Sequence, residues 1–570
     1  MAPEPSSSDS SLFTELRRRG VLGVAVVYGV VGWTVVEVAD AVFPALDLPD
    51  WTVTLVVALV LLGFPLALVL AWALERTPQG VQRAAPAGGR RVAAAFVLGI
   101  ALVAVLAFLV VDAPSASEAR SYTAIAVLPF EDLSPDDRSY FSEGIAEELM
   151  DVLATVPELD VAGRASAFAF RDRTAGVTEI GARLGVDAVL DGSVRRDGDD
   201  LRISVQLIDV ADGRVLWSHR YDRQAGDIFA LQDEIASAVA GEVDIRLSLP
   251  PPAEADAARL RAHDLYLRGL AAWHRRTSRG MEEASRLFHR AIAADSTYAA
   301  AHGGVALTHA LFPMFVDDPG RDHAEIALRA ADRALALDPG AAEAHAALSQ
   351  RAVVLTWDRE TGVAEARKAI ELRPSYATGW QWYGEALMVQ YRLDESLAAL
   401  ERAIELDPLA AAPRNVRAGV LYASGRRDAA LTEIREARDR FPDVPLFHDN
   451  LLGIGLCEVD TTLILEGAAG LRVPELDAAL PALLDPVRAP PGSPRREALE
   501  RLVATAPSHF RSRLALLMAG LGEYDLALRT LHAVVSDGDD PGFLYTLVMP
   551  CYDPIREDPR FRAVLDRLPS

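Results

Sequence analysis

Three short stretches decide the fold of this chain: ALALDP (334–339), AIELRP (369–374) and AIELDP (403–408). Each has an alanine five residues before its proline, and the same spacing recurs at Ala437 and Pro442. The four prolines are separated by 35, 34 and 34 residues. Proline cannot continue an α-helix, so each stretch predicts a helix end. A fixed period of this length predicts helical hairpins that stack and bury their apolar sides against one another.

The period and its residue pattern resemble the tetratricopeptide repeat. Trp380 and Gly384 occupy the large and small positions of the first helix of that motif, and AIAADS (291–296) marks an earlier unit whose successor is lengthened around 312–320. We therefore expect at least four repeats, with a degenerate closing unit near the C-terminus. The resemblance implies a superhelix with a concave groove that binds peptide segments.

The partner-binding residues predicted for this groove lie on first helices of matched repeats: Gln381, Glu385, Asn415 and Tyr422. Chaperone-binding relatives hold a terminal carboxylate with lysines, but Lys368 is the only lysine here. We therefore expect a protein or peptide partner with a neutral or basic segment rather than a free carboxylate.

A second soluble domain precedes the repeats. A strand-like run, 123–130, leads into a helical pattern, and from 188 to 221 apolar residues alternate with polar ones around the turns Asp197-Gly198 and Asp212-Gly213. Such turns are typical of β-hairpins. The predicted order is β-α-β-α-β-β-β-α, an α/β domain with a mixed sheet.

The strings IAVLPFEDLSPDDRSYFSEGIAEELMDVLA (125–154), VAGRASAFAF (161–170) and DIFALQDEIASAV (227–239) resemble the TolB N-terminal-like domain of bacterial proteins, which is related to the FlgO and CsgG assembly proteins. This resemblance covers 122–247 and implies protein–protein interaction at the cell envelope, without a known reaction. Some relatives with this module carry a nucleotide-cyclase or a winged-helix DNA-binding domain, so a regulatory function is an alternative.

Three runs of apolar residues near the N-terminus predict transmembrane helices at about 21–43, 51–74 and 92–111. Each is long enough to cross a bilayer as a helix. Arginines precede the first run and lie between the second and third, whereas Asp47 and Asp50 lie in the loop between the first two. The positive-inside rule then predicts a multi-pass bacterial inner-membrane protein, with a cytoplasmic N-terminus and periplasmic C-terminal domains.

Composition and motifs exclude several functions. The net charge of -24 disfavours nucleic-acid binding. The sequence contains no phosphate-binding loop, nucleophile elbow, zinc-protease or kinase motif, so we expect no catalytic, cofactor-binding or metal-binding residues. The carboxylates near Asp132 and Glu147 are interpreted as solvated, and His302, His309 and His323 as structural. The sequence leaves open whether Cys457 and Cys551 pair.

The predicted fold is multidomain, with three transmembrane α-helices, an α/β TolB-like domain and an α-α superhelix of repeats. The main hypothesis for the function of the protein is a periplasmic scaffold or sensor that binds a protein partner. The alternatives are a membrane regulatory protein and an enzyme with unrecognised chemistry. Homo-oligomers are left open. The predicted segments are a cytoplasmic segment (1–19), a membrane domain (20–112), a linker (113–121), the TolB-like domain (122–247), a Pro-rich linker (248–258), the repeats (259–445) and a degenerate cap (446–570).

Overall fold

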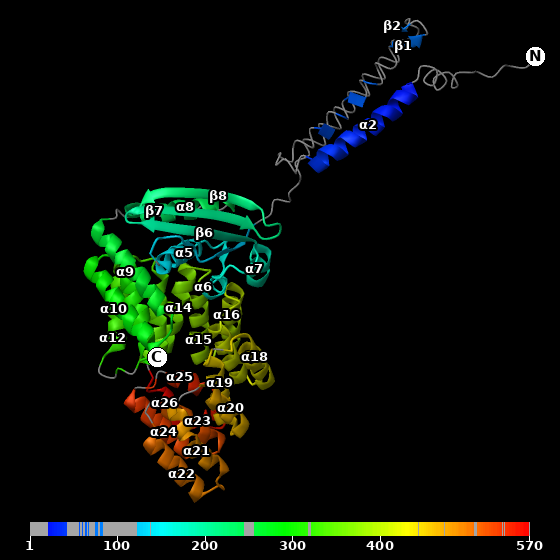
Figure 1. Ribbon diagram of the computed structural model, residues 1–570. Coiled ribbons are helices and arrows are strands. Elements are labelled where there is room, and N and C mark those ends of the chain that lie inside the picture. Colours follow the sequence, from blue (N-terminus) through cyan, green and yellow to red (C-terminus); the bar gives the residue numbers. More distant parts are fainter. Residues whose placement is uncertain are drawn as a thin grey trace, which may run out of the picture. The chain divides into compact units, whose positions relative to one another are not determined.

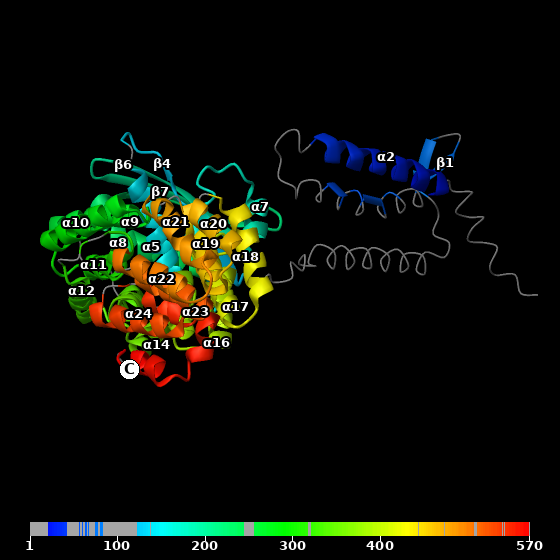
Figure 2. The same ribbon diagram turned by 90° about the horizontal axis from the view of Figure 1, so that it is seen from below.

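The computed structural model describes residues 21–42, parts of 56–83, and 122–568 except 137, 244–255, 317, 319–320, 443, 472–473, 507–509, 539 and 541 (Figures 1 and 2). The chain divides into two compact units, Met1–Arg120 and Ser121–Ser570. Each unit is described by itself below.

The described part of the N-terminal unit holds helix α2 (Val21–Val42) and a hairpin of β1 (Leu74–Thr77) and β2 (Gly80–Arg83). Among the described residues, no helix combines the length and the apolar character that crossing a membrane requires. The prediction of three transmembrane helices, and with it the multi-pass inner-membrane placement, is therefore wrong. The prediction relied on runs of apolar residues, although two carboxylates lie within α2 and charge is costly inside a bilayer. The predicted span 92–111, and most of 51–74, lie outside the described residues.

The α/β domain, residues 122–243, is built on one mixed sheet with the strand order β5-β3-β6-β7-β8, and a short strand, β4, pairs with β6. β3 runs parallel to β5 and β6, whereas β6, β7 and β8 form an antiparallel meander. The predicted order of elements is confirmed except for two short elements that were not predicted, β4 and the helix α6 (Arg164–Phe168). The strands are β3 (Ala124–Val127), β4 (Glu131–Asp132), β5 (Asp160–Val161), β6 (Ala188–Asp197), β7 (Asp200–Asp209) and β8 (Val215–Gln224).

Helices cover both faces of this sheet. On one face, α5 (Ser139–Leu153) and α8 (Ile228–Glu242) bury Ile145, Leu149 and Ile235 against the strands. On the other face, α7 (Val177–Leu184) packs against Ala126 and Val189 of the sheet and against Phe170, which follows the short helix α6 (Arg164–Phe168). The alternation of apolar residues along β7 matches this arrangement, because successive side chains of a strand point to opposite faces.

The repeat array, residues 257–537, consists of paired antiparallel helices. Its helices are α9 (Ala257–Trp273), α10 (Ser278–Ala294), α11 (Ala299–Leu311), α12 (His323–Leu337), α13 (Ala342–Gln350), α14 (Arg359–Leu372), α15 (Ala377–Val389), α16 (Leu393–Leu406), α17 (Ala412–Ala423), α18 (Arg427–Arg440), α19 (Leu446–Glu458), α20 (Thr461–Leu471), α21 (Pro474–Arg488), α22 (Ser493–Thr505), α23 (Arg511–Gly520) and α24 (Tyr524–Asp537).

The repeat period is visible in the backbone as well as in the sequence. Helices α12, α14, α16 and α18 each end two residues before one of the four periodic prolines. The turns between paired helices contain left-handed residues at Trp357, Tyr391, Gly425 and Val459, each 34 residues from the next. A residue in the left-handed conformation reverses the direction of the chain after a helix. Glycine adopts this conformation without steric cost, as at Gly425. The tetratricopeptide-like repeats are therefore confirmed.

The α/β domain and the first repeats share one hydrophobic core. Leu149 of α5 belongs to the same buried cluster as Leu267 of α9 and Phe288 of α10. A Cβ added at Gly144 of α5 would lie 2.7 Å from a methyl group of Leu267, so glycine permits the close approach of the two helices. Figure 1 shows α5 and α6 on the side of the sheet that faces the repeats. The domain boundaries given above remain predictions.

The C-terminal region folds back onto the array. Short helices α25 (Phe543–Leu547), η6 (Pro550–Ile555) and α26 (Pro559–Leu565) follow α24, and α25 packs against α15. Tyr391 donates a hydrogen bond to the backbone oxygen of Leu547 over 2.9 Å. A disulfide between Cys457 of α19 and Cys551 of η6 fixes this segment to the array, which answers the question that the sequence left open.

Candidate partner-binding cavity

A cavity of about 2060 Å³ lies on the inner side of the repeat array. Its wall comes mainly from the first helices of successive repeats, such as α11, α15, α17 and α19. The α/β domain supplies a further part through Glu147 and Asp151 of α5 and through the segment 161–165. Residues 545–549, after the fold-back of the chain, also contribute. The groove expected from the repeats is thus a cavity that another domain helps to enclose.

Three of the four predicted partner-binding residues line this cavity: Gln381, Glu385 and Asn415. Tyr422 does not belong to the lining. Its side chain is 4% exposed and packs in the core between α17 and its neighbours. The placement of Tyr422 on an inward face was therefore wrong, because an aromatic residue at helical spacing filled the space between helices instead. Binding of a partner by the other three stays a prediction.

Glu385 is a buried carboxylate held by neutral donors. The amide groups of Gln381 and Gln350 donate to it over 2.8 and 3.0 Å, and the hydroxyl of Tyr545 donates over 3.0 Å. Burial raises the pKa of this carboxyl above its ordinary value, although the three donors oppose the rise. Asn415 is similarly engaged, since its two oxygen atoms accept hydrogen bonds from the amide of Asn450. These amides offer polar groups that suit a peptide backbone.

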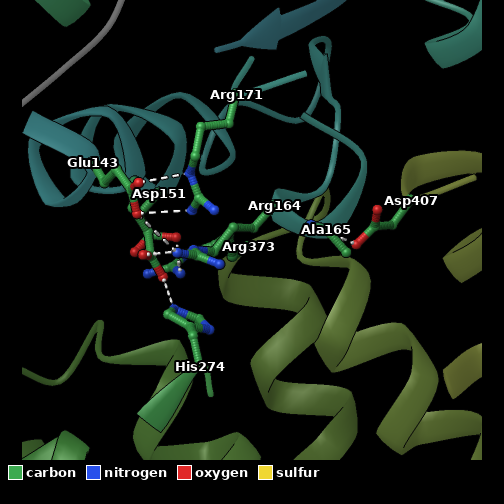
Figure 3. Close-up of polar contacts among 9 residues, drawn as sticks. Glu143, Asp151, Arg164, Ala165, Arg171, His274, Arg373 and Asp407 are labelled. Carbon is green, nitrogen blue, oxygen red and sulfur yellow. Dashed lines mark hydrogen bonds and ion pairs between the residues drawn. The ribbon is translucent and has the colours of Figure 1, made fainter. Parts of the chain in front are cut away.

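Where the α/β domain meets α16 and α17, Asp407 caps the beginning of α6 from another domain. Its carboxylate accepts hydrogen bonds from the backbone N–H and the hydroxyl of Ser166. It also accepts a hydrogen bond from the N–H of Ala165 over 3.3 Å (Figure 3). The N–H of Gly163 donates to the backbone oxygen of Leu406 over 2.6 Å. A Cβ at Gly163 would lie 2.5 Å from the Cβ of Asp407, so only glycine allows this approach.

A buried ion-pair group links α5 to the array beside this contact. Arg373, which is 8% exposed, pairs with Asp151 of α5 over 2.8 Å and with Glu343 of α13 over 2.5 Å. Burial opposes the charge of Arg373, but the two carboxylates outweigh it and raise the pKa of the guanidinium above its ordinary value. The nearby Ser375 donates a hydrogen bond from its hydroxyl to the backbone oxygen of Leu159.

Acidic residues of α5 that were interpreted as solvated face basic partners instead. Glu147 pairs with His274 over 2.7 Å and with Arg164 over 2.9 Å, and Arg171 binds Glu143 (Figure 3). Burial opposes ionisation of Glu147, but His274 and Arg164 lower its pKa to about 2. Glu148 contacts His263 over 3.0 Å. These contacts were not predicted from the sequence. The one signal that could have indicated them is that the carboxylates of α5 and Arg164 lie in the strings that carry the family resemblance.

The histidines also form a structural cluster. His309 and His323 contact each other through their Nδ1 atoms over 2.9 Å, and the hydroxyl of Ser285 lies 3.1 Å from Nε2 of His309. His302 lies apart and contacts the backbone oxygen of Ser296. Helix α11 ends at Leu311 and α12 begins at His323, so His309 and His323 lie on different helices.

The raised pKa of Asp407 predicts that stability depends on pH. Burial raises this pKa to about 6, while the hydrogen bonds from Ser166 oppose the rise. Between pH 4 and 6 the folded chain therefore holds a proton that the unfolded chain has lost, so stability falls as pH rises through this window. We expect a decrease of about 2–3 kcal/mol between pH 4 and 7.

Urea unfolding at both pH values should show this decrease in the wild type, and Asp407→Asn should lack that part of the pH dependence. The variant keeps an oxygen acceptor for Ser166 but does not ionise. Equal pH dependence of the two proteins would contradict the assignment.

Parts of the chain are similar to known proteins. Residues 121–238 match the family described as the HilA/YgeH-like transcriptional regulator, second domain. A putative adenylate cyclase of Rhizobium meliloti (strain 1021) is 34% identical over 249 residues, which are 42% of this chain and 42% of that protein. The chain thus spans less than half the length of this curated relative. The α/β module is related to one found in regulators, as the alternative hypothesis expected.

Solved structures match only part of the chain. A thermophilic tetratricopeptide protein of Thermus thermophilus is 20% identical, covers 37% of this chain and 100% of its own, and has a TM-score of 0.29. PilF of Pseudomonas aeruginosa is 18% identical, covers 43% of this chain and 100% of its own, and has a TM-score of 0.27.

Proposed function

We propose that this chain is a regulatory protein that binds an extended peptide segment of a protein partner in the cavity, and that it performs no chemistry of its own. The observation that carries the proposal is the wall of the cavity. Inner helices of several repeats form it together with the family-motif residues of the α/β domain. A ligand in this cavity would therefore touch both domains and would stabilise their contact.

The dimensions and the polar groups of the cavity favour a peptide over a small molecule. Pockets for small ligands measure roughly 300–1,000 Å³, whereas this cavity has a volume of about 2060 Å³. Gln381, Asn415 and Asn450 present amide groups that can donate to and accept from a peptide backbone. The regulator-type relatives support a role in regulation rather than in assembly of the envelope.

Capture of a degenerate decapeptide library by the immobilised full chain tests peptide binding. The double variant Gln381→Ala/Asn415→Ala should retain at least about fivefold less peptide, because two amide contacts of about 0.5–1.5 kcal/mol each are lost. The matched control is Arg435→Ala, whose side chain is exposed on α18 outside the cavity lining. Equal retention by the double variant and the control would show that the cavity is not the site.

The name of the Rhizobium relative invites an enzymatic reading, which has its own test. Incubation of the full chain with ATP and Mg²⁺ or Mn²⁺ should yield no cyclic AMP above a heat-inactivated sample. Cyclic AMP formation that a cavity variant abolishes would replace the binding proposal with a catalytic one.

A further inference from the structure

One arginine of the cavity differs from the others in its partners. Five of the six arginines in the described lining pair with a carboxylate within 4.0 Å, and Arg276 does not. Among the described residues, no hydrogen bond of its guanidinium is found either. The paired arginines are Arg164, Arg259, Arg321, Arg373 and Arg513.

The local structure holds Arg276 in place without neutralising it. It lies in the turn between α9 and α10, where its φ of 48° is uncommon for a residue other than glycine. Its guanidinium lies over the ring of Trp273, 3.6 Å from the ring centre. The indole Nε1 of Trp273 is buried and also lacks a hydrogen-bond partner in the described structure. A cation and an N–H donor therefore lie side by side without an acceptor.

The guanidinium of Arg276 keeps its charge at neutral pH. Burial lowers its pKa to about 10; Tyr376 opposes this shift, and the positive charge of Arg164 adds to it. The described lining holds more carboxylates than arginines, but none of these carboxylates forms an ion pair with Arg276. Arg276 is half-buried, and an anion would supply the partner that the lining does not.

We propose that Arg276 binds an anionic group, a carboxylate or a phosphate ester, on the peptide segment that the cavity takes. This inference rests on the proposed function and specifies its ligand. A guanidinium that stacks on an aromatic ring keeps its N–H groups free at its edge, where they can form two parallel hydrogen bonds to such a group. Because Lys368 is the only lysine, a neutral or basic segment was expected; that expectation is thereby revised, because the charge nearest the ligand decides the contact.

Four oriented decapeptide libraries test this inference with the full chain. Their central residue is glutamate, glutamine, phosphoserine or lysine, and the flanking positions are degenerate. We expect the wild type to retain the glutamate or phosphoserine library about tenfold more than the glutamine library, which matches one charge-assisted hydrogen-bonded pair. Arg276→Gln should abolish the preference, and Arg276→Lys should restore part of it. Arg279→Gln, at an exposed position of α10, is the matched control and should leave it unchanged.

The outcomes separate this inference from the proposed function. A stronger response to glutamate identifies a carboxylate, and a stronger response to phosphoserine identifies a phosphate. Equal retention of all four libraries, a preference for lysine, or a preference that survives Arg276→Gln would overturn the role of Arg276 while peptide binding stands. Retention of none of the libraries would overturn both. Circular dichroism of each variant shows whether the fold is kept.

Discussion

Replacement of Arg373 by methionine should lower the free energy of unfolding by about 3–5 kcal/mol, because it removes the cation of a buried ion-pair group. Arg373 lies between Asp151 of α5 and Glu343 of α13, and its side chain is only 10% exposed. Methionine keeps much of the volume but leaves two carboxylates near each other without a cation. The loss therefore comes from uncompensated charge rather than from a cavity.

Urea unfolding at pH 7 measures this effect. The matched control is Arg402→Met, which removes a second contact between the same two domains, the pair of Arg402 with Asp160. The side chains of Arg402 and Asp160 are 31% and 43% exposed. Solvent screens such pairs, so the expected loss in the free energy of unfolding is at most about 1 kcal/mol. Similar losses for the two variants would contradict the claim that burial makes the ion pairs of Arg373 the stronger link between the domains.

Loss of the disulfide should have an effect of similar size. Cys457 and Cys551 are 94 residues apart, and their bond restricts a long loop in the unfolded chain. Replacement of both by serine should therefore lower the free energy of unfolding by about 4–5 kcal/mol. The segment that the disulfide fixes includes α25, whose Tyr545 reaches Glu385 in the cavity, so peptide capture should weaken as well.

Thermal unfolding with and without a reducing agent measures the contribution of the disulfide. The wild type should lose stability on reduction, whereas the double serine variant should not respond. A wild type that is insensitive to complete reduction, with both thiols titrated as free, would show that the bond adds nothing to stability.

The parts of the fold that were predicted correctly depend on local patterns. The period of the prolines correctly predicted the repeats, because neighbouring residues determine where each helix ends. The alternation of apolar and polar residues along β7 and the two Asp-Gly turns predicted the meander of β6, β7 and β8 for the same reason. Gln381, Glu385 and Asn415 were placed on the cavity wall because position within one repeat determines which side of a helix faces inward.

The contacts that failed prediction join residues far apart in the sequence. Asp407 and Ser166 are 241 residues apart, and no local pattern shows that a repeat residue completes a helix of another domain. The carboxylates of α5 were interpreted as solvated because their basic partners lie in the repeats. Tyr422 was misplaced because an aromatic residue suits both a groove and a core. The apolar N-terminal runs were misjudged because their length, their apolar character and the arginines that flank them are typical of membrane spans.

Photocrosslinking from the two sides of the cavity tests the central claim most directly. A photoreactive residue is introduced at Ala165 of the α/β domain, at Thr378 of α15 in the array, or at Arg435 outside the cavity, and each full chain is exposed to the degenerate decapeptide library. We predict that peptides enriched by binding crosslink at 165 and at 378 but not at 435. Crosslinking at 435 alone, or at none of the three positions, would contradict a peptide site enclosed by both domains.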